Sequence, residues 1–359
     1  MRVSVFGEMK PPYRVPSMQQ IARIKPNGFK AISLFAGAGG SSLGYRLSGF
    51  RMLWASEFID AARDVYNANK TPYTIVDGRD IRDVDPSEVV EKIDMKPGEV
   101  DLLDGSPPCS SFSAIGKKYK GWGKSKKYSD RAQRTDDLFF EYVRFVRAIQ
   151  PKVFVAENVA GLVKGAAKGY FLDILRELKA CGYRVEARLL DAQWLGVPQQ
   201  RERLIFVGVR EDLGRNPAFP TPLSYRYSMR EAFEGLQAPV EPETDISRYA
   251  IGDAYDWLTP GKWSDRFMSL GYRSLDEPSF AITARAASPS TAGIVHPTEK
   301  RKFSVGELRR LSSFPDDFVL SGSYEQQCER IGRAVPPLMA AAIATAIRDQ
   351  VLIPAITAT

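Results

Sequence analysis

A short apolar run, a glycine-rich turn and an amphipathic stretch follow one another at residues 31–50, and this order constrains the fold most. The run AISLF (31–35) has the length of a buried strand. Gly37-Ala38-Gly39-Gly40 then permits a tight turn, and the following SSLGYRLSGF has apolar residues at helical spacing. A strand that passes through a glycine turn into a helix is typical of α/β folds that bind nucleotides or cofactors.

Further strand-length apolar runs recur along the chain as far as residue 209. They lie at 50–58, 100–106, 152–158, 183–192 and 203–209. Helical stretches at 135–150 and 170–182 separate some of them. Alternating strands and helices predict an α/β fold with a largely parallel sheet covered on both faces.

The α/β alternation stops near Arg210, which indicates a division into domains. Residues 210–300 are rich in Pro, Ser, Thr and Tyr and have little helical period, so they predict a smaller irregular domain or a β-rich insert. Regular structure resumes with FSVGELRRLSSF and ends in an alanine-rich helix after Pro336-Pro337. We therefore expect four segments: a basic extension (1–30), a main domain (31–209), a second domain (210–300) and a return segment (301–359) that completes the main domain.

Composition excludes several classes of protein. An apolar fraction of 44% and a charged fraction of 26% are those of a soluble globular chain. The charged, proline-containing N-terminus is unlike a secretory signal, and no uninterrupted 18-residue apolar run occurs, so we expect a cytoplasmic protein without a membrane span. Three cysteines without a CxxC pair and a single histidine, His296, argue against disulfide frameworks and zinc or multi-histidine sites, so no metal is expected.

The net charge of +7 is concentrated in two segments. Residues 1–30 hold six basic groups against one acid, and residues 110–135 hold eight against one. Such clusters suit contact with phosphate groups. Two solvated, flexible segments would explain the charge equally well.

The glycine turn brings backbone N–H groups and a helix N-terminus to a ligand, while an acid after the second strand can bind ribose hydroxyls. Glu57 stands at that place, twenty residues beyond Gly37. NAD, FAD and S-adenosylmethionine sites all use this arrangement, and a purely structural turn is a further alternative. The turn residues are Phe35, Gly37, Gly39 and Gly40.

Cys109 follows the predicted strand at 100–106 through Pro107-Pro108. The thiol therefore lies at the carboxyl edge of the sheet, where open α/β folds bind their ligands. A buried, inert thiol is the usual state of a free cysteine. The serines and lysines that follow favour a thiolate, so we interpret Cys109 as a nucleophile.

Glu157 ends the strand at 152–158, and partial removal from water would favour its protonated form, which suits proton donation. Arg201 and Arg203 begin the strand at 203–209, and strand alternation predicts that both point to one face. Two guanidinium groups can stabilise an oxyanion or hold a phosphate. The alternatives are a helix N-cap or a salt bridge for Glu157 and an ordinary strand-end ion pair for the arginines.

Six stretches, in order and together, closely resemble the DNA (cytosine-5) methyltransferases. They extend over residues 31–337 and comprise AISLFAGAGGSSLG, DLLDGSPPCSSFS, VFVAENVAGL, VPQQRERLIFVGV, RRLSSFPDDF and IGRAVPP. The resemblance implies a Rossmann-like S-adenosylmethionine-dependent methyltransferase fold with a mixed, mainly parallel sheet. It also implies that 31–209 is the catalytic and cofactor-binding domain and that 210–300 is the target-recognition domain.

The resemblance implies a covalent mechanism on a cytosine flipped out of duplex DNA. The Cys109 thiolate would add to C6, Glu157 would contact N3, and Arg203 would hold O2. C5 would then take the methyl group, and loss of its proton would release Cys109. The site residues carried over are Cys109, Glu157, Arg203, Arg201, Pro108 and Asn158 for catalysis.

For S-adenosylmethionine, the resemblance implies contacts from the turn, from the ends of the next strands and from two later segments. The cofactor residues carried over are Phe35, Gly37, Gly39, Gly40, Glu57, Phe58, Asp80, Ile81, Pro107, Leu138, Arg333 and Val335. The basic loop after Cys109 corresponds to the family's mobile DNA-closing loop. Its expected DNA contacts are Lys117, Lys118, Lys120, Lys124, Lys126 and Lys127.

Arg333 departs from the family pattern, which usually has Gly-Asn in this segment. We favour an arginine that pairs with a nearby acid or a DNA phosphate. A guanidinium can also hold a carboxylate by two hydrogen bonds, so carboxy-S-adenosylmethionine and a carboxymethyl product are one alternative. An RNA-directed enzyme, a silent DNA-binding relative and a nicotinamide-dependent oxidoreductase are others. The expected partner is double-stranded DNA, the expected state is a monomer in a prokaryotic or viral setting, and a cognate restriction nuclease is an expected companion.

Overall fold

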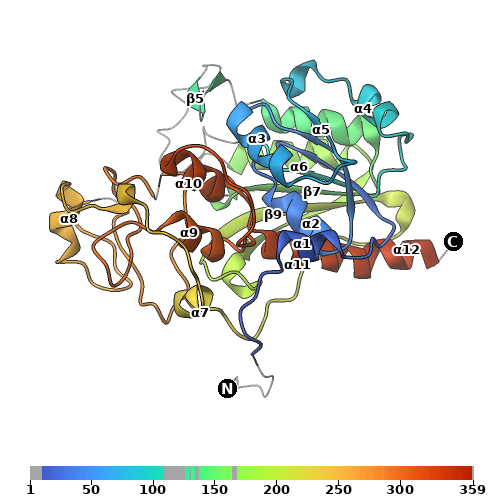
Figure 1. Cartoon of the computed structure of the whole chain (residues 1–359). Helices are drawn as coiled ribbons and strands as arrows, with labels where there is room; N and C mark the ends of the chain where they lie inside the picture. Colours follow the sequence, from blue (N-terminus) through green and yellow to red (C-terminus); the bar gives the residue numbers. More distant parts are fainter. Residues whose placement is uncertain are drawn as a thin grey trace. The chain divides into compact units, whose positions relative to one another are not determined.

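A seven-stranded sheet organises the larger part of the computed structural model (Figure 1). The structure describes residues 10–108, 126–128, 131–133, 137–163, 168–267, 269–285 and 287–357, with the backbone alone at 126–128 and 131–133. The strand order is β3-β2-β1-β4-β7-β9-β8. The strands are β1 (Lys30–Leu34), β2 (Arg51–Ser56), β3 (Ile75–Asp77), β4 (Leu102–Gly105), β7 (Val153–Val159), β8 (Tyr183–Asp191) and β9 (Glu202–Arg210).

The sheet is parallel from β3 to β7, and β9 pairs antiparallel with β7. Every strand predicted from sequence is present within a few residues of its expected bounds. The α/β fold with a mixed, mainly parallel sheet is therefore confirmed. Short β3 was missed, because three residues carry no readable period.

Helices connect the parallel strands and bury the sheet. The connecting helices are α2 (Gly40–Leu47), α3 (Asp60–Asn69), α4 (Pro86–Lys92), α5 (Leu138–Ile149) and α6 (Lys168–Lys179), and α11 (Pro337–Ile347) and α12 (Ile353–Thr357) end the chain. Figure 1 shows α5 on one face of the sheet and α2 on the other. Fully buried Ile32, Leu103 and Phe154 pack in one core with residues of α4, α5 and α6. Such burial of apolar side chains is the main stabilising contribution to a fold of this kind.

Two compact units make up the chain. The sheet unit comprises Ile24–Leu190, Glu202–Pro220 and Ala340–Thr359, and the loop-rich unit comprises Met1–Arg23, Asp191–Arg201 and Thr221–Met339. Residues 301–339 thus cluster with the 221–300 region, whereas the sequence suggested that they return to the main domain. The functional roles of the four sequence segments stay predictions.

The loop-rich unit has short helices and little regular strand, in keeping with the irregular pattern of its sequence. Its helices are α1 (Met18–Ala22), α7 (Met229–Phe233), α8 (Ala250–Tyr255), α9 (Val305–Leu311) and α10 (Tyr324–Arg333). All but α8 begin with a capping box, in which a serine and a Glu or Gln three residues later bond reciprocally to the backbone. The capping serines are Ser17, Ser228, Ser304 and Ser323.

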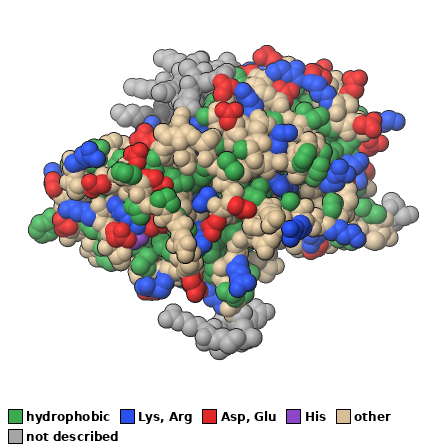
Figure 2. Space-filling view, in the orientation of Figure 1, with side chains coloured by type: hydrophobic (Ala, Val, Ile, Leu, Met, Phe, Trp, Pro, Cys, Tyr) green, Lys and Arg blue, Asp and Glu red, His purple; other side chains and the backbone are tan. Residues whose placement is uncertain are grey.

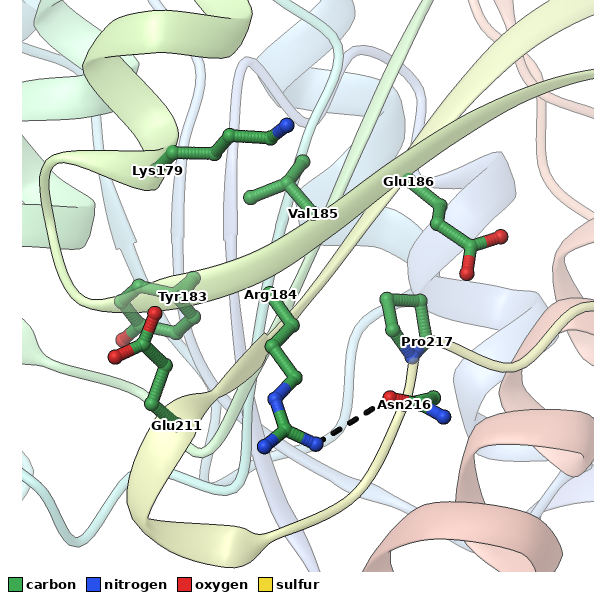
Figure 3. Close-up of a pocket in the computed structure, with 8 residues that line it drawn as sticks. All are labelled: Lys179, Tyr183, Arg184, Val185, Glu186, Glu211, Asn216 and Pro217. Carbon is green, nitrogen blue, oxygen red and sulfur yellow. Dashed lines mark hydrogen bonds between the residues drawn. The ribbon is translucent and has the colours of Figure 1, made fainter.

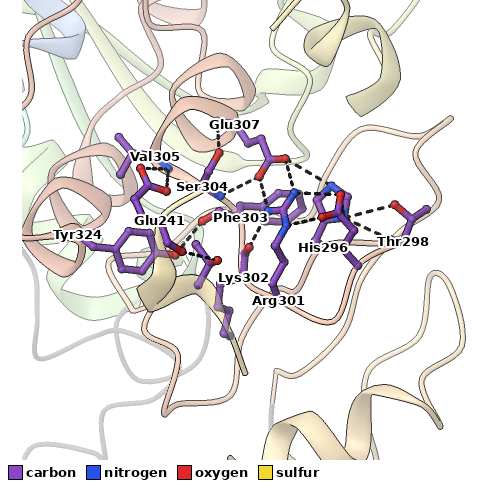
Figure 4. A network of polar contacts seen from close by, with 12 residues as sticks. Glu241, His296, Thr298, Arg301, Lys302, Phe303, Ser304, Val305, Glu307 and Tyr324 are labelled. Carbon is purple, nitrogen blue, oxygen red and sulfur yellow. Dashed lines mark hydrogen bonds and ion pairs between the residues drawn. The ribbon is translucent and has the colours of Figure 1, made fainter. Parts of the chain in front are cut away.

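A polar network lies inside the loop-rich unit (Figure 4). Arg301 forms ion pairs with Glu307 at 2.7 Å and Glu299 at 2.9 Å, and both acids also face His296. Burial lowers the pKa of His296 and lowers that of fully buried Lys302 to about 7. The single histidine is therefore a buried structural residue.

The chain's charges are mixed on the face shown in Figure 2, where basic and acidic side chains are interspersed. Within the basic N-terminal segment, Lys10 pairs with Glu231 at 2.6 Å, whereas Arg14, Arg23 and Lys25 are exposed. The second basic cluster has no described side chains. Two antiparallel strands within it, β5 (Lys126–Tyr128) and β6 (Arg131–Gln133), are described by their backbone.

One helical stretch of the described residues, Tyr324–Thr357, is long and apolar enough to cross a membrane by length and composition. Its apolar window has a mean hydropathy of 1.4 and is 44% buried within the protein. Core helices of soluble proteins meet the same criteria, so this stretch is weak evidence for a membrane span.

The Tyr142 hydroxyl ties two central strands together, and its removal tests this contact. The hydroxyl donates to Val155 O at 2.9 Å and Leu103 O at 3.2 Å. Tyr142→Phe is expected to lower the free energy of unfolding by about 1–2 kcal/mol, because a buried hydrogen bond is lost. Urea unfolding measures the change, with Tyr73→Phe, at a 43% exposed side chain, as the control. Equal stability of the two variants would contradict this role.

Candidate active site

The glycine turn joins β1 to α2 in a left-handed backbone conformation that favours glycine. Gly37 and Gly39 have φ angles of 56° and 89°, and Phe35 also has a positive φ of 54°. A Cβ on Gly39 would lie 3.0 Å from the ring of Tyr66, whereas a Cβ on Gly37 would meet no atom within 4 Å. The Tyr66 ring therefore packs against the turn at Gly39, whereas the space beside Gly37 is open. This space leaves room for a ligand next to the backbone of the turn. Gly40 begins α2.

Glu57 follows β2 and is bonded to this turn. Its two carboxylate oxygens accept hydrogen bonds from Gly37 N at 2.8 Å and Ile59 N at 2.7 Å. The side chain is only 8% exposed. The Arg63 guanidinium also bonds the carbonyls of Glu57 and Phe58, at 3.2 and 3.4 Å. The acid is thus held in one position beside the turn, as a ribose-binding carboxylate must be.

Asp80 and Leu138 are brought together by an arginine that sequence reasoning missed. Arg82 pairs with Asp80 at 2.9 Å and with Asp137, directly before α5, at 2.6 Å. Ile81 and Leu138 are buried in the same apolar cluster. These contacts join the segment after β3 to the start of α5. The i,i+2 spacing of Asp80 and Arg82 was the only available signal in the sequence.

Pro107 and Asn158 meet at the carboxyl edge of the sheet. The Asn158 amide donates to Pro107 O at 3.3 Å, and its own oxygen accepts from Val159 N at 2.8 Å. β4 and β7 are parallel with Gly105 opposite Ala156, so the half-buried Pro108 and the strand end with Glu157 lie at the same edge. Cys109 itself lies outside the described residues.

Glu157 and Arg203 form an ion pair across two adjacent strands. Arg203 Nε lies 2.8 Å from Glu157 Oε1, and the side chains are 17% and 15% exposed. Antiparallel pairing places Arg203 opposite Val159 and Ile205 opposite Glu157. The two residues predicted to contact the base are therefore in direct contact, and both remain accessible to a ligand.

Arg201 differs from Arg203, because β9 begins at Glu202 and strand alternation does not reach Arg201. Arg201 is 3% exposed and belongs to the loop-rich unit. Its guanidinium donates to the carbonyls of Ile282, Gly332 and Ala334 at 2.6–3.1 Å. These hydrogen bonds connect backbone segments within that unit, so they give Arg201 a structural role.

Arg333 and Val335 also belong to the loop-rich unit. Arg333 Nε donates to Glu329 at 2.7 Å, one helical turn earlier in α10. Val335 is 8% exposed. Of the six predicted DNA-contacting lysines, Lys117, Lys118, Lys120 and Lys124 lie outside the described residues, and Lys126 and Lys127 are described by their backbone alone.

An open cavity of about 410 Å³ lies elsewhere in the sheet unit, beside β8 (Figure 3). It is lined by Lys179, Tyr183, Arg184, Val185, Glu186, Glu211, Asn216 and Pro217. Arg184 bonds Asn216 at 3.3 Å across one side of it. None of the residues predicted to act in catalysis or cofactor binding lines this cavity. Among the described residues, no cluster of His, Cys, Asp and Glu is arranged to hold a metal ion.

The strand order, the glycine turn and the acid after β2 define a Rossmann-like fold of the S-adenosylmethionine-dependent methyltransferase class. A solved structure of a protein encoded within an Escherichia coli prophage has the same fold. It aligns with a TM-score of 0.72 at 19% identity over 90% of this chain and 99% of its own.

Residues 29–349 match the sequence profile of the family C-5 cytosine-specific DNA methylase. Type II methyltransferase M1.HphI of Haemophilus parahaemolyticus is 33% identical over 88% of this chain and 86% of its own length. Type II methyltransferase M.FnuDI of Fusobacterium nucleatum is 31% identical over 89% and 94%. The chain belongs to the C-5 cytosine-specific DNA methylase family.

A substitution at Glu57 tests whether its carboxylate organises the cofactor site. Glu57→Gln keeps the size but replaces one acceptor oxygen by an amide NH₂, which cannot accept from Gly37 N or Ile59 N. We expect about tenfold weaker binding of S-adenosylmethionine in calorimetric titration, the equivalent of about 1.4 kcal/mol. Glu88→Gln, at a part-exposed acid on α4 that pairs with Arg79 and Lys92, is the control. Unchanged affinity in Glu57→Gln would contradict the assignment.

Proposed function

We propose that this protein transfers a methyl group from S-adenosylmethionine to C5 of a cytosine in double-stranded DNA, through a covalent bond between Cys109 and C6. The observation that carries the proposal is the Glu157–Arg203 pair, 2.8 Å apart, at the end of β7. Asn158, the next residue of β7, bonds Pro107, two residues before Cys109. An acid and a guanidinium therefore lie beside Pro107, at the end of the described chain that leads to Cys109.

The turn and Glu57 fit S-adenosylmethionine, because the space beside Gly37 is open and Glu57 is fixed next to it. When bound, S-adenosylmethionine supplies an electrophilic methyl group. Glu57 would hold the ribose, with Phe58, Asp80, Ile81 and Leu138 around the adenine. Family membership supports use of this cofactor.

The chain's own residues would carry the base chemistry. The Cys109 thiolate adds to C6, and Glu157 hydrogen-bonds or protonates N3 while Arg203 holds O2 as electron density moves into the ring. C5 then accepts the methyl group, loses its proton to a water or hydroxide, and expels the thiolate from C6. Glu157 and Arg203 pair with each other until a flipped cytosine offers N3 and O2 to them.

Residues 210–300 are our proposed target-recognition region. It holds ten basic and thirteen acidic groups. Its net charge is therefore negative and does not attract DNA phosphates in general. Recognition of the DNA target sequence by this region would depend on a few base contacts, and the lysine-rich segment at 110–135 would supply the affinity for DNA. The curated relatives are named Type II methyltransferases, which supports a place beside a cognate restriction nuclease in the cytoplasm of a prokaryotic cell.

Loss of the thiol tests the covalent mechanism. Cys109→Ala is expected to abolish methylation while S-adenosylmethionine binding stays within about twofold of wild type, because the substitution removes only the nucleophile. Tritium transfer to duplex DNA and calorimetry measure the two properties. A duplex with 5-fluorocytosine should trap the native protein covalently, because fluorine at C5 blocks the final elimination. Methylation by the alanine variant at the native rate would disprove the mechanism.

The bond from Arg333 to Glu329 supports methyl rather than carboxymethyl transfer, because the arginine already has a carboxylate partner. Native protein and Arg333→Asn, offered S-adenosylmethionine and carboxy-S-adenosylmethionine together, should both form 5-methylcytosine by nucleoside mass spectrometry. The pair spans one helical turn and is part-exposed, so its loss should cost only about 0.3–0.5 kcal/mol of stability. A carboxymethyl product that disappears in Arg333→Asn would contradict methyl transfer.

A further inference from the structure

Asp104 in β4 is a buried acid that the proposed chemistry leaves unused. The residue is 3% exposed. One carboxylate oxygen accepts from Ser33 Oγ at 2.8 Å and Ser41 Oγ at 2.7 Å, and the other accepts from the Tyr45 hydroxyl at 3.0 Å. Burial of a carboxylate costs folding free energy even when hydrogen bonds satisfy it. Its three donors therefore offset a cost that an apolar side chain would avoid.

The donors to Asp104 come from two different elements. Ser33 lies in β1, directly opposite Asp104 in the sheet. Ser41 and Tyr45 lie in α2, which begins at Gly40, immediately after the glycine turn. The carboxylate thus ties the first turn of α2 to the sheet, whereas its bond to Ser33 only joins strands that already pair.

The glycine turn and the first turn of α2 are held from three sides. Glu57 accepts from Gly37 N, and the Tyr66 ring packs against Gly39 while its hydroxyl donates to Ser42 at 3.0 Å. Asp104 holds the neighbouring Ser41. α2 has no side-chain cap at Gly39, so these contacts fix where its free N–H groups point.

We propose that Asp104 is a positioning residue for the cofactor, acting through Ser41 to hold the first turn of α2 in the orientation that binds S-adenosylmethionine. The inference rests on the proposed function for the identity of the cofactor. β4 ends at Gly105, directly after Asp104, and Pro107 follows two residues later, so one carboxylate links the cofactor turn to the strand that leads to Cys109.

The charge on Asp104 gives the link a pH dependence. Burial raises the pKa of Asp104 to about 6, while its three hydroxyl donors act in the opposite direction. Other ionisable groups that interact with it are Glu157, Tyr45, Tyr66 and Tyr142. As the pH falls through 6, Asp104 gains a proton and accepts fewer hydrogen bonds. The hydrogen bond from Ser41 to Asp104 therefore weakens.

Two serine variants provide a matched test, because each removes one hydroxyl donor from the same carboxylate oxygen. Ser41→Ala should weaken S-adenosylmethionine binding about tenfold in calorimetry and raise its KM similarly, with kcat unchanged at saturating cofactor. Ser33→Ala should leave the affinity within about twofold, since α2 stays attached. Thermal unfolding of both variants reports any loss of stability separately. Equal effects of the two variants on affinity would overturn the proposal.

A pH series gives an independent readout. Wild-type affinity for S-adenosylmethionine should fall as the pH is lowered through 6, whereas Asp104→Asn should show a weaker and pH-independent affinity over that range. An Asn variant with wild-type affinity and pH profile would overturn the positioning role. If wild-type protein binds no S-adenosylmethionine at any pH, the proposed function itself fails, which is a distinguishable result.

Discussion

Parallel pairing of β1, β2, β4 and β7 is the constraint on which the candidate site depends. It brings the carboxyl ends of the four strands to one edge, where the chain leaves the sheet and its side chains become available to ligands. The glycine turn, Glu57, Pro107 and Glu157 all follow or end these strands. Helices on both faces bury the sheet and leave this edge as the place for chemistry.

Three carboxylates near this edge are held by different kinds of donor, and the donors indicate different tasks. Glu57 accepts from two backbone N–H groups, Asp104 from three hydroxyls and Glu157 from a guanidinium. Glu157 keeps 15% of its side chain exposed, so a substrate can reach it, whereas Asp104 at 3% can act only through its neighbours. Burial thus distinguishes Glu157, which can contact the substrate, from Asp104, which orients neighbouring residues.

The antiparallel strand β9 shows how much depends on where a strand begins. Arg203 lies inside β9 and contacts Glu157 on β7, whereas Arg201 lies one residue before the strand and binds three carbonyls of the loop-rich unit, to which it belongs. Sequence spacing predicted one shared face for both arginines. Arg201 precedes the first residue of β9 and has a different environment, because alternation applies only within the strand.

Local sequence alone determined the strands other than the short β3, the glycine turn and the serine caps, because each depends on residues within a few positions of one another. Positive φ at Gly37 and Gly39 and the placement of Glu57 after β2 are of this kind. Tertiary structure alone decided that Arg82 pairs with Asp137, 55 residues further along the chain, and that Asp104 in β4 meets Ser41 in α2. Such contacts depend on strand order and register, which are set by burial of the whole sheet and not by any short segment.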